Sequence, residues 1–263
     1  MANIWTDLGF DMSASATPPG VPLLSSAIAG TTTNDNAAAG IVGEYLSNTA
    51  DFATAGITAT MTTASPTVVT ATAHGQAALA AVWFTNSGGG IGTGMVVNTN
   101  YYITKGTVTA NTFQLSSTMA LALAGTSDIN VTVGGTGTQT VHPGALLASA
   151  TAADVVGLAL TAGDWDVDAL ITPTYQGSTS VTLTACWLGT SGGSSLPATS
   201  GALLAAGAVQ TQSAAIVTPA QGLNTNTIRV SLAAPGMVVC SAKSTFSVST
   251  TSMTGTIRAR RVR

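Results

Sequence analysis

The sequence contains very little charge. It has 7 basic and 10 acidic residues among 263, so that 6% of the chain is charged, whereas about a quarter of an ordinary soluble domain is charged. Catalytic sites, metal sites and nucleic-acid-binding surfaces all draw on charged side chains. This composition is more typical of a structural building block than of an enzyme. Because low charge also promotes association, we expect the protein to function inside an assembly.

Long apolar runs and cysteine motifs are also missing. No apolar run approaches the ~18–20 residues of a membrane-spanning helix, and the first residues lack the basic and apolar regions of a secretory signal. We therefore expect no membrane partner, and folding in a cytoplasm. The two cysteines, Cys186 and Cys240, form no C-x-x-C motif. They are expected to be buried, reduced thiols, with a disulfide as the alternative.

The residues that replace charge are threonine, serine, alanine and glycine. In segments such as 57–63 and 227–232, small or branched apolar residues alternate with hydroxyl residues, which is typical of half-buried strands. Residues 52–142 contain five or six such runs at a spacing of about 8–12 residues, and residues 120–140 are expected to add a further pair of strands. No segment longer than about ten residues has a strong helical period. After Pro143 we expect strands near 155–160, 164–172, 179–188, 213–218, 226–233, 236–249 and 253–262.

Residues 1–39 have a different composition. They contain Pro18, Pro19 and Pro22 and little periodicity. Five large apolar residues interrupt this polar, proline-broken segment: Trp5, Leu8, Phe10, Leu23 and Leu24. We interpret the segment as an extended arm that anchors the protein to a partner through these residues. A disordered terminus is the alternative.

Three separated motifs resemble one family of phage virion proteins. The first is Thr31-Thr-Thr-Asn-Asp-Asn36 followed by Gly43-Glu44-Tyr45-Leu46-Ser47. The second is Leu160-Thr-Ala-Gly-Asp-Trp-Asp-Val167, and the third is the terminal Ile257-Arg-Ala-Arg-Arg-Val-Arg263. In that family of small virion and prophage proteins a short gap separates the first two motifs, whereas here residues 48–159 lie between them. Within this stretch, residues 71–116 are similar to a second β module of phage tail and fibre proteins.

The resemblance implies an all-β fold with three parts. Residues 40–51 and 143–263 would form a discontinuous, jelly-roll-like antiparallel sandwich that typically assembles as a trimer. Residues 52–142 would form an inserted small barrel or sandwich, and residues 1–39 the arm. Symmetric association would also cover the exposed edges of such a sandwich without requiring charge.

The charges that are present are separated along the chain. All ten acidic residues lie within residues 1–168, with Lys105 as the single base there, and residues 169–263 contain six bases and no acid. Asp164, Asp166 and Asp168 alternate along one predicted strand and share a face. Neighbours on that face are ~6.6–6.8 Å apart, too far to converge on Ca²⁺, so we favour a solvated or inter-subunit polar face.

The arginines near the end of the sequence form the densest charge cluster: Arg258, Arg260, Arg261 and Arg263. On a strand, Arg258 and Arg260 would face one side, and Arg261 and Arg263 the other side with Ile257. We expect them to contact the acidic face of another subunit, with a solvated terminus as the alternative. Four arginines without interleaved aromatic residues do not predict nucleic-acid binding.

Aromatic residues of the insert occur as adjacent pairs, Trp83-Phe84 and Tyr101-Tyr102. Each pair should point one ring inward and one outward. An outward Phe84 or Tyr101 is a candidate receptor contact for a host-surface glycan, although packing against a neighbouring chain is an equal alternative.

No combination of residues predicts catalysis or cofactor binding. The two histidines, His74 and His142, do not form a recognisable triad with a serine, and Glu44 is the single glutamate, so a paired-carboxylate glycosidase has no distinctive candidate. The glycine cluster at 88–94 lacks the Gly-Lys-Ser/Thr of a phosphate loop. We expect no enzyme activity, no cofactor and no bound metal.

Together these observations predict a non-enzymatic phage virion protein, assembled in the host bacterial cytoplasm. We expect a capsid decoration or head-fibre protein that contacts the major capsid protein through its arm and trimerises through the sandwich. The alternative is a tail fibre or tail-appendage adhesin that contacts tail components and a host receptor.

Overall fold

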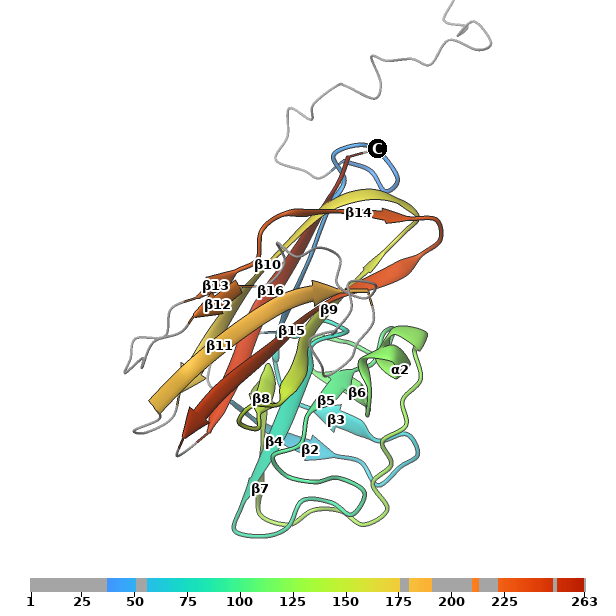
Figure 1. The fold of residues 1–263 in the computed structure, drawn as a ribbon. Coiled ribbons are helices and arrows are strands. Elements are labelled where there is room, and N and C mark those ends of the chain that lie inside the picture. Colours follow the sequence, from blue (N-terminus) through green and yellow to red (C-terminus); the bar gives the residue numbers. More distant parts are fainter. Residues whose placement is uncertain are drawn as a thin grey trace, which may run out of the picture.

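The computed structural model describes residues 37–50, 56–175, 180–190, 210–212, 222–247 and 250–262. It confirms an all-β fold, in which every pairing between described strands is antiparallel. The strands form two packed sheets and a closed barrel, with the barrel at one end of the molecule (Figure 1).

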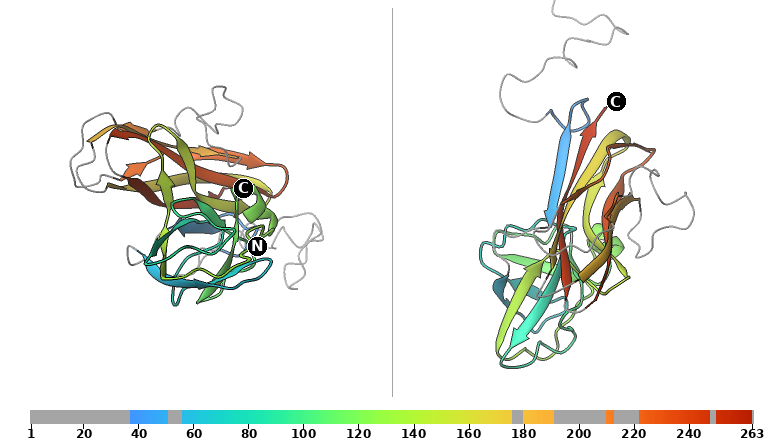
Figure 2. Two further views of the ribbon diagram at one scale, coloured as in Figure 1. Left: turned by 90° about the horizontal axis from the view of Figure 1, so that it is seen from below. Right: turned by 60° about the vertical axis from the view of Figure 1, so that its left-hand side comes forward.

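The first sheet has six strands, in the order β1-β16-β10-β13, with β14 also paired to β10 and β8 to β16. Its strands are β1 (Tyr45–Ala50), β8 (Ala145–Leu147), β10 (Gly163–Tyr175), β13 (Leu223–Asn224), β14 (Ile228–Leu232) and β16 (Thr251–Arg261). The second sheet has the order β12-β11-β15-β9. Its strands are β9 (Ala152–Leu160), β11 (Ser180–Gly189), β12 (Gln210–Gln212) and β15 (Gly236–Ser247). Figure 2 shows the two sheets as stacked layers.

Alternation along the long strands explains this packing. In β10, Trp165, Val167, Ala169 and Ile171 are buried, while Asp166, Asp168 and Leu170 face outward. In β16, every second residue from Thr251 to Arg261 is buried. Gly255 lies where β16 and β10 approach closely, since a Cβ there would come within 2.4 Å of Cδ1 of Ile171. The period of two therefore directs one face of this sheet into the core.

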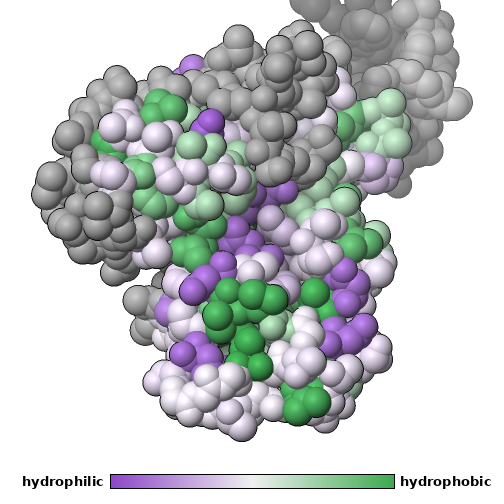
Figure 3. Space-filling view, turned by 60° about the horizontal axis from the view of Figure 1, so that its bottom comes forward, coloured by the Kyte–Doolittle hydropathy of each residue, from purple (hydrophilic) through white to green (hydrophobic). Residues whose placement is uncertain are grey.

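The barrel has the strand order β2-β3-β6-β5-β4-β7. Its strands are β2 (Ile57–Met61), β3 (Val68–Thr70), β4 (Ala81–Ser87), β5 (Tyr101–Ile103), β6 (Thr112–Ser116) and β7 (Thr138–Pro143). Barrel strands thus lie within residues 57–143, and the strands of the two packed sheets lie on either side of this range in the sequence. Figure 3 shows hydrophobic residues gathered on the bottom face of the barrel.

The prediction of a pair of strands within residues 120–140 is wrong for most of that range. Residues Met119–Ala124 form a short helix, α2, and the next strand begins only at Thr138. The hydroxyl of Thr118 caps α2 by accepting from the amide of Leu121, and Gly125 ends it with φ +74°. Leucine and alanine have high helix propensity, and with these caps one helical turn is favoured over a strand. The strand expected at 213–218 lies outside the described residues.

The barrel is joined to the sandwich by direct contacts as well as by the chain. Buried residues of both parts form one continuous hydrophobic core. The side-chain amide of Asn48 in β1 donates to the carbonyl of Ala78, before the barrel strand β4, at 2.7 Å, and to the carbonyl of Gly157 in β9 at 2.6 Å. The amide of Gly157 in turn donates to the carbonyl of Leu79 at 2.8 Å. These bonds tie β1, β9 and the barrel together.

We predict that Asn48→Ala lowers the free energy of unfolding by about 2–4 kcal/mol, because it leaves two carbonyl groups without their donor. Ser47→Ala, at an exposed neighbour on the same strand, should change it by less than about 0.5 kcal/mol. Urea unfolding of both variants measures the difference. Equal losses would show that the Asn48 bonds do not join the two parts.

Candidate functional site: the arginine cluster and the charged sheet face

Arg261, near the end of β16, is the most deeply buried charge among the described arginines and lysines. Its Nε lies 2.9 Å from Oε2 of Glu44, and both side chains are only 5% exposed. One terminal nitrogen donates to the carbonyl of Ala162 at 2.8 Å, and the other donates to the hydroxyl of Thr161. The guanidinium carbon lies 4.2 Å from the ring centroid of Trp165. The charge is therefore paired, hydrogen-bonded and stacked, as a buried arginine requires.

The partners of Arg261 are themselves held by hydrogen bonds. The carboxylate of Glu44 accepts from the amide of Gly40 at 2.7 Å, and the indole of Trp165 donates to the carbonyl of Thr161 at 3.0 Å. The backbones of β1 and β16 also meet here, since the amide of Arg261 donates to the carbonyl of Glu44 at 2.8 Å. We call these residues, Glu44, Thr161, Ala162, Trp165 and Arg261, the arginine cluster.

The three sequence motifs meet in this cluster. Glu44 belongs to the first motif, Thr161, Ala162 and Trp165 to the second, and Arg261 to the third. Although more than a hundred residues separate the first two motifs, β1 and β10 flank β16 in one sheet. The alternation of β16 places Arg261 on the face of Ile257, as expected, but its pairing with Glu44 was not foreseen. The signal was available in part, because an arginine on the apolar face of a strand needs a buried acid.

The other arginines lie on the outer face of the same sheet. Nε of Arg229 is 2.7 Å from Oδ1 of Asp166, and Nε of Arg258 is 2.8 Å from Oδ1 of Asp168. These pairs are much more exposed than the cluster, with 42% exposure for Arg258 and 25% for Asp168. Two of the three aspartates expected to contact another subunit, Asp166 and Asp168, are thus already paired within the chain. Arg263 lies outside the described residues.

Asp166 and Asp168 share the outer face of β10, as predicted, and each accepts from its own arginine. Asp164, the third residue of the expected set, is 8% exposed and its carbonyl accepts from the amide of Val262 at 2.9 Å. Among the residues that the structure describes, no group of three or more His, Cys, Asp or Glu side chains is placed to hold a metal ion.

A shallow hollow of about 400 Å³ lies on this outer face. It is lined by Tyr45, Asp166, Asp168, Thr227, Arg258, Ala259 and Arg260. Tyr45 and Asp166 flank Arg260 in the strand register, since both are paired to it across neighbouring strands. Asp166 nevertheless bonds to Arg229, so no described carboxylate forms an ion pair with Arg260.

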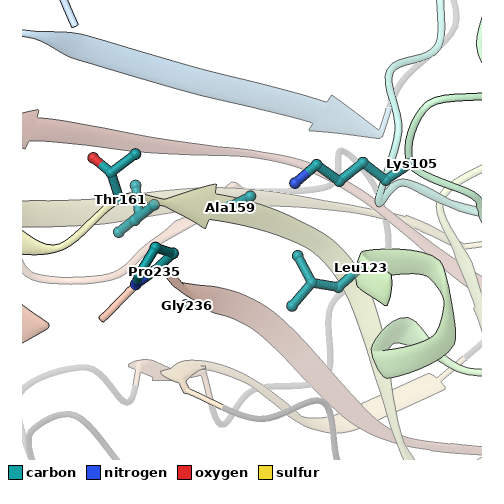
Figure 4. Close-up of a pocket in the computed structure, with 7 residues that line it drawn as sticks. Lys105, Leu123, Ala159, Thr161, Pro235 and Gly236 are labelled. Carbon is teal, nitrogen blue, oxygen red and sulfur yellow. The ribbon is translucent and has the colours of Figure 1, made fainter. Parts of the chain in front are cut away.

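A second hollow, of about 370 Å³, lies between the barrel and the sandwich (Figure 4). Lys105 and Leu123 reach it from the barrel side, and Ala159, Thr161 and Pro235 line it from the sandwich side. Among the described residues that line it, Lys105 is the single charged one, and their polar groups do not form a convergent set that would indicate a catalytic site.

Phe84 and Tyr101 are not surface residues, so the prediction of receptor contacts by outward rings is wrong. Phe84 is 0% exposed and Tyr101 5% exposed, and their ring centroids are 6.1 Å apart. Phe84 is buried because closure of the barrel directs one face of β4 inward. The hydroxyl of Tyr101 accepts from the amide of Val96 at 2.8 Å, which fixes the Tyr101 ring beneath a loop. Trp83, on the outer face of β4, stacks on His142 with centroids 4.1 Å apart.

The two cysteines are free and buried, as expected. Burial raises the pKa of the Cys240 thiol, with smaller contributions from Cys186 and Asp154. A thiol with a raised pKa is a poor nucleophile. No helix in the described ranges is long and apolar enough to cross a membrane.

His74 is a buried histidine in a barrel turn. Its Nδ1 accepts from the amide of Gln76 at 3.0 Å, and its ring meets the edge of Phe113 with centroids 4.9 Å apart. Burial lowers the pKa of His74. In the opposite direction, burial raises the pKa of Tyr101, Tyr102 and Tyr175.

We predict that truncating Glu44 costs far more than truncating Asp168. Glu44→Ala leaves the Arg261 charge buried without its counter-ion and should lower the free energy of unfolding by about 3–5 kcal/mol. Asp168→Ala removes a half-exposed partner and should cost at most about 1 kcal/mol. Urea unfolding compares them, and the double variant Glu44→Leu/Arg261→Met should recover most of the loss. Similar losses for the two single variants would contradict the structural role of the cluster.

We predict that stability falls on both sides of a plateau between about pH 6.5 and 10. Below the unfolded-state pKa of histidine, the unfolded chain takes up a proton that folded His74 resists, so unfolding is favoured as the pH falls. Above the unfolded-state pKa of tyrosine, the unfolded chain releases protons that the buried tyrosines retain, so unfolding is favoured as the pH rises.

Melting temperatures of the wild-type protein at pH 5 and pH 8 test the predicted loss of stability below the plateau. His74→Asn keeps an acceptor for the amide of Gln76 but has no titrating ring. The melting temperature of this variant should therefore fall less between pH 8 and pH 5 than that of the wild-type protein. An unchanged pH dependence in the variant would exclude His74 as the source.

Comparisons with known proteins identify no family. No family model matches the sequence, and no curated protein matches it. Among solved structures, the chain is similar to the VP2 subviral particle of infectious bursal disease virus, with 8% sequence identity, a TM-score of 0.26, and coverage of 83% of this chain and 72% of that one. A similarity at this level establishes neither fold nor function.

Proposed function

We propose that this chain is a non-enzymatic structural protein of a bacteriophage virion, a capsid decoration or head-fibre protein that attaches through residues 1–39 and trimerises through its sandwich. The observation that carries the proposal is the convergence of the three virion-type motifs in the arginine cluster. Residues that resemble one family and also form one buried contact support a shared fold more strongly than scattered matches do.

The engagement of the acidic side chains supports a structural role. In the described part of the chain, Glu44, Asp166 and Asp168 are bonded to arginines. The carboxylate of Asp128 accepts from the amide of Ser117 at 2.7 Å, and that of Asp154 from the hydroxyl of Ser241 at 2.6 Å. Such carboxylates stabilise strands and turns, whereas a general acid or base must reach a substrate.

Attachment through the arm is supported by where the described chain begins. Residues 37–44 precede β1 at the end of the sandwich that carries the C-terminus, opposite the barrel (Figures 1 and 2). Ile41, Val42 and Tyr45 are exposed there, and an exposed apolar group of this kind favours a protein contact. The proposed anchors, Trp5, Leu8, Phe10, Leu23 and Leu24, lie outside the described residues.

Trimerisation is supported by the edge position of β1. This strand ends the six-stranded sheet and pairs only with β16 among the described strands. An uncovered edge invites pairing with other chains, and a closed symmetric assembly covers such surfaces in every copy. Other virion proteins, the major capsid protein first among them, would be the remaining partners, and assembly would take place in the host bacterial cytoplasm.

The second candidate function is that of a tail fibre or tail-appendage adhesin. The observation that favours it is the exposure of Val96, Val97 and Val133 in barrel loops, at the end of the molecule opposite residues 37–44. An apolar patch far from the attachment end would suit a receptor on the host surface.

Cryo-electron microscopy of the purified phage particle tests the proposal. Density for this chain on the head, with the β1 end toward capsid subunits and the barrel outward, is the expected result. Density at the tail with the barrel outward would favour the adhesin. If mass spectrometry of the purified particles does not detect this chain, both the head role and the adhesin role are refuted.

A further inference from the structure

Residues 73–80, which lie between β3 and β4, contact the sandwich through their backbone. The carbonyl of Leu79 accepts from the amide of Gly157 in β9 at 2.8 Å. The carbonyl of Ala78 accepts from the side-chain amide of Asn48 in β1 at 2.7 Å. We call residues 73–80 the junction segment, because it belongs to the barrel and bonds to a strand of each packed sheet.

The backbone of the junction segment is strained at Leu79. This residue has a left-handed conformation, with φ +65°, which is unfavourable for a bulky side chain and persists only where surrounding contacts hold it. The amide of Leu79 donates to the carbonyl of Ile103 in the barrel at 2.8 Å, and its carbonyl is held by Gly157. Ala73, at the start of the segment, is also left-handed, with φ +53°. The segment therefore keeps this conformation because it is held at both ends.

His74 is the titratable residue of the junction segment, and its hydrogen bond requires a neutral ring. Its side chain is 2% exposed. Nδ1 accepts from the amide of Gln76 at 3.0 Å, so the proton of the neutral ring is on Nε2. A second proton would have to bind at Nδ1, where it would remove the acceptor and bring two N–H donors face to face.

The surroundings of His74 offer nothing that would stabilise an imidazolium. Apart from His74 itself, residues 67–80 and 107–117, which include the ring neighbour Phe113, contain no Asp, Glu, Lys, Arg, His, Tyr or Cys. Burial lowers the pKa of His74, and the backbone of Thr112 and Thr109 opposes this effect only in part. The titratable residues that come next along the chain are Tyr101, Tyr102, Lys105 and Asp128. Protonation is therefore unfavourable while the segment is closed and favourable once water reaches the ring.

We propose that the junction segment is a pH-sensitive latch, in which a proton taken up from solvent by His74 releases the barrel from the sandwich. The proton on Nδ1 displaces the amide of Gln76, which lies three residues before the strained Leu79. Relaxation of Leu79 then breaks its bond to Gly157. The strand pairings within the barrel and within the two sheets do not use these bonds and are retained. This device is separate from the proposed virion role and does not depend on it.

The size of the effect follows from the linkage between proton binding and opening. In the open segment, His74 has the ordinary pKa of about 6.5, whereas the closed segment resists the proton. Stability of the closed state is therefore complete above that pKa and is lost as the pH falls below it. Between pH 8 and pH 5, the equilibrium constant for opening should increase by up to about 30-fold.

Amide hydrogen exchange of the full chain, followed by NMR spectroscopy, tests the latch. Protection of the Gly157 and Leu79 amides, corrected for the intrinsic pH dependence of exchange, should fall by about 30-fold from pH 8 to pH 5. At pH 5 their exchange should not respond to urea below the unfolding transition, because a local opening exposes little surface. The β10 amides that bond to β16 should exchange more slowly and accelerate with urea, through global unfolding.

Variants of the two histidines identify the group that responds. His74→Asn keeps an acceptor for the amide of Gln76 but does not titrate, so the protection of Gly157 should be the same at pH 8 and pH 5. His142→Asn changes the other histidine of the chain and should keep the 30-fold response. It also leaves His74 as the single imidazole, so its ring resonances report on His74 alone, and they should be those of a neutral ring while Gly157 is protected.

Four results would overturn the latch. The first is unchanged protection of Gly157 between pH 8 and pH 5, and the second is the same pH response in His74→Asn. The third is urea-sensitive exchange of Gly157 at the rate of the β10 amides, which would show that this bond opens only with the whole fold. The fourth is a protonated His74 ring in His142→Asn protein whose Gly157 amide stays protected, a result that does not depend on the folding of His74→Asn.

Discussion

The fold depends on one buried guanidinium. Arg261 is removed from water, and an isolated charge in that position would be strongly unfavourable. The two strands that flank β16 supply what it needs: the Glu44 carboxylate lies before β1, the Thr161 and Ala162 oxygens lie before β10, and the Trp165 ring lies within β10. Because no single strand could satisfy the charge, burial of Arg261 requires that β1, β10 and β16 come together.

Much of the remaining structure follows from that constraint. With β1 fixed on β16, Asn48 is placed to bond with Gly157 and Ala78, which brings the barrel against β9. The same pairing puts Tyr45 beside Arg260 and places residues 37–44 at one end of the sheet. The proposed attachment therefore uses one end of the molecule, while the exposed barrel loops lie at the other end.

Alternation made a large part of the fold predictable. The period of two in 164–172, 226–233 and 253–262 predicted β10, β14 and β16 closely, because each of these strands has one face in the core. The strand expected at 236–249 is β15, in which residues 237–242 are buried without alternation. Residues 119–124 were not predicted as helix, since a six-residue element shows too little period and depends on its caps. Phe84 and Tyr101 were misassigned because local alternation gives two faces without saying which one a closed barrel encloses. The pairs Glu44–Arg261 and Asp166–Arg229 depend on strand order and register between distant segments, which no local pattern contains.

Hydrogen exchange of the native protein, followed by mass spectrometry on the peptide spanning 43–50, tests the dependence on the arginine cluster most directly. If the cluster locks β1 into the sheet, the amides of Leu46 and Asn48 should exchange as slowly as those of β10 and β16, through global unfolding. Fast exchange in β1 alone, at the rate of a fraying edge strand, would show that β1 opens independently and would contradict the account.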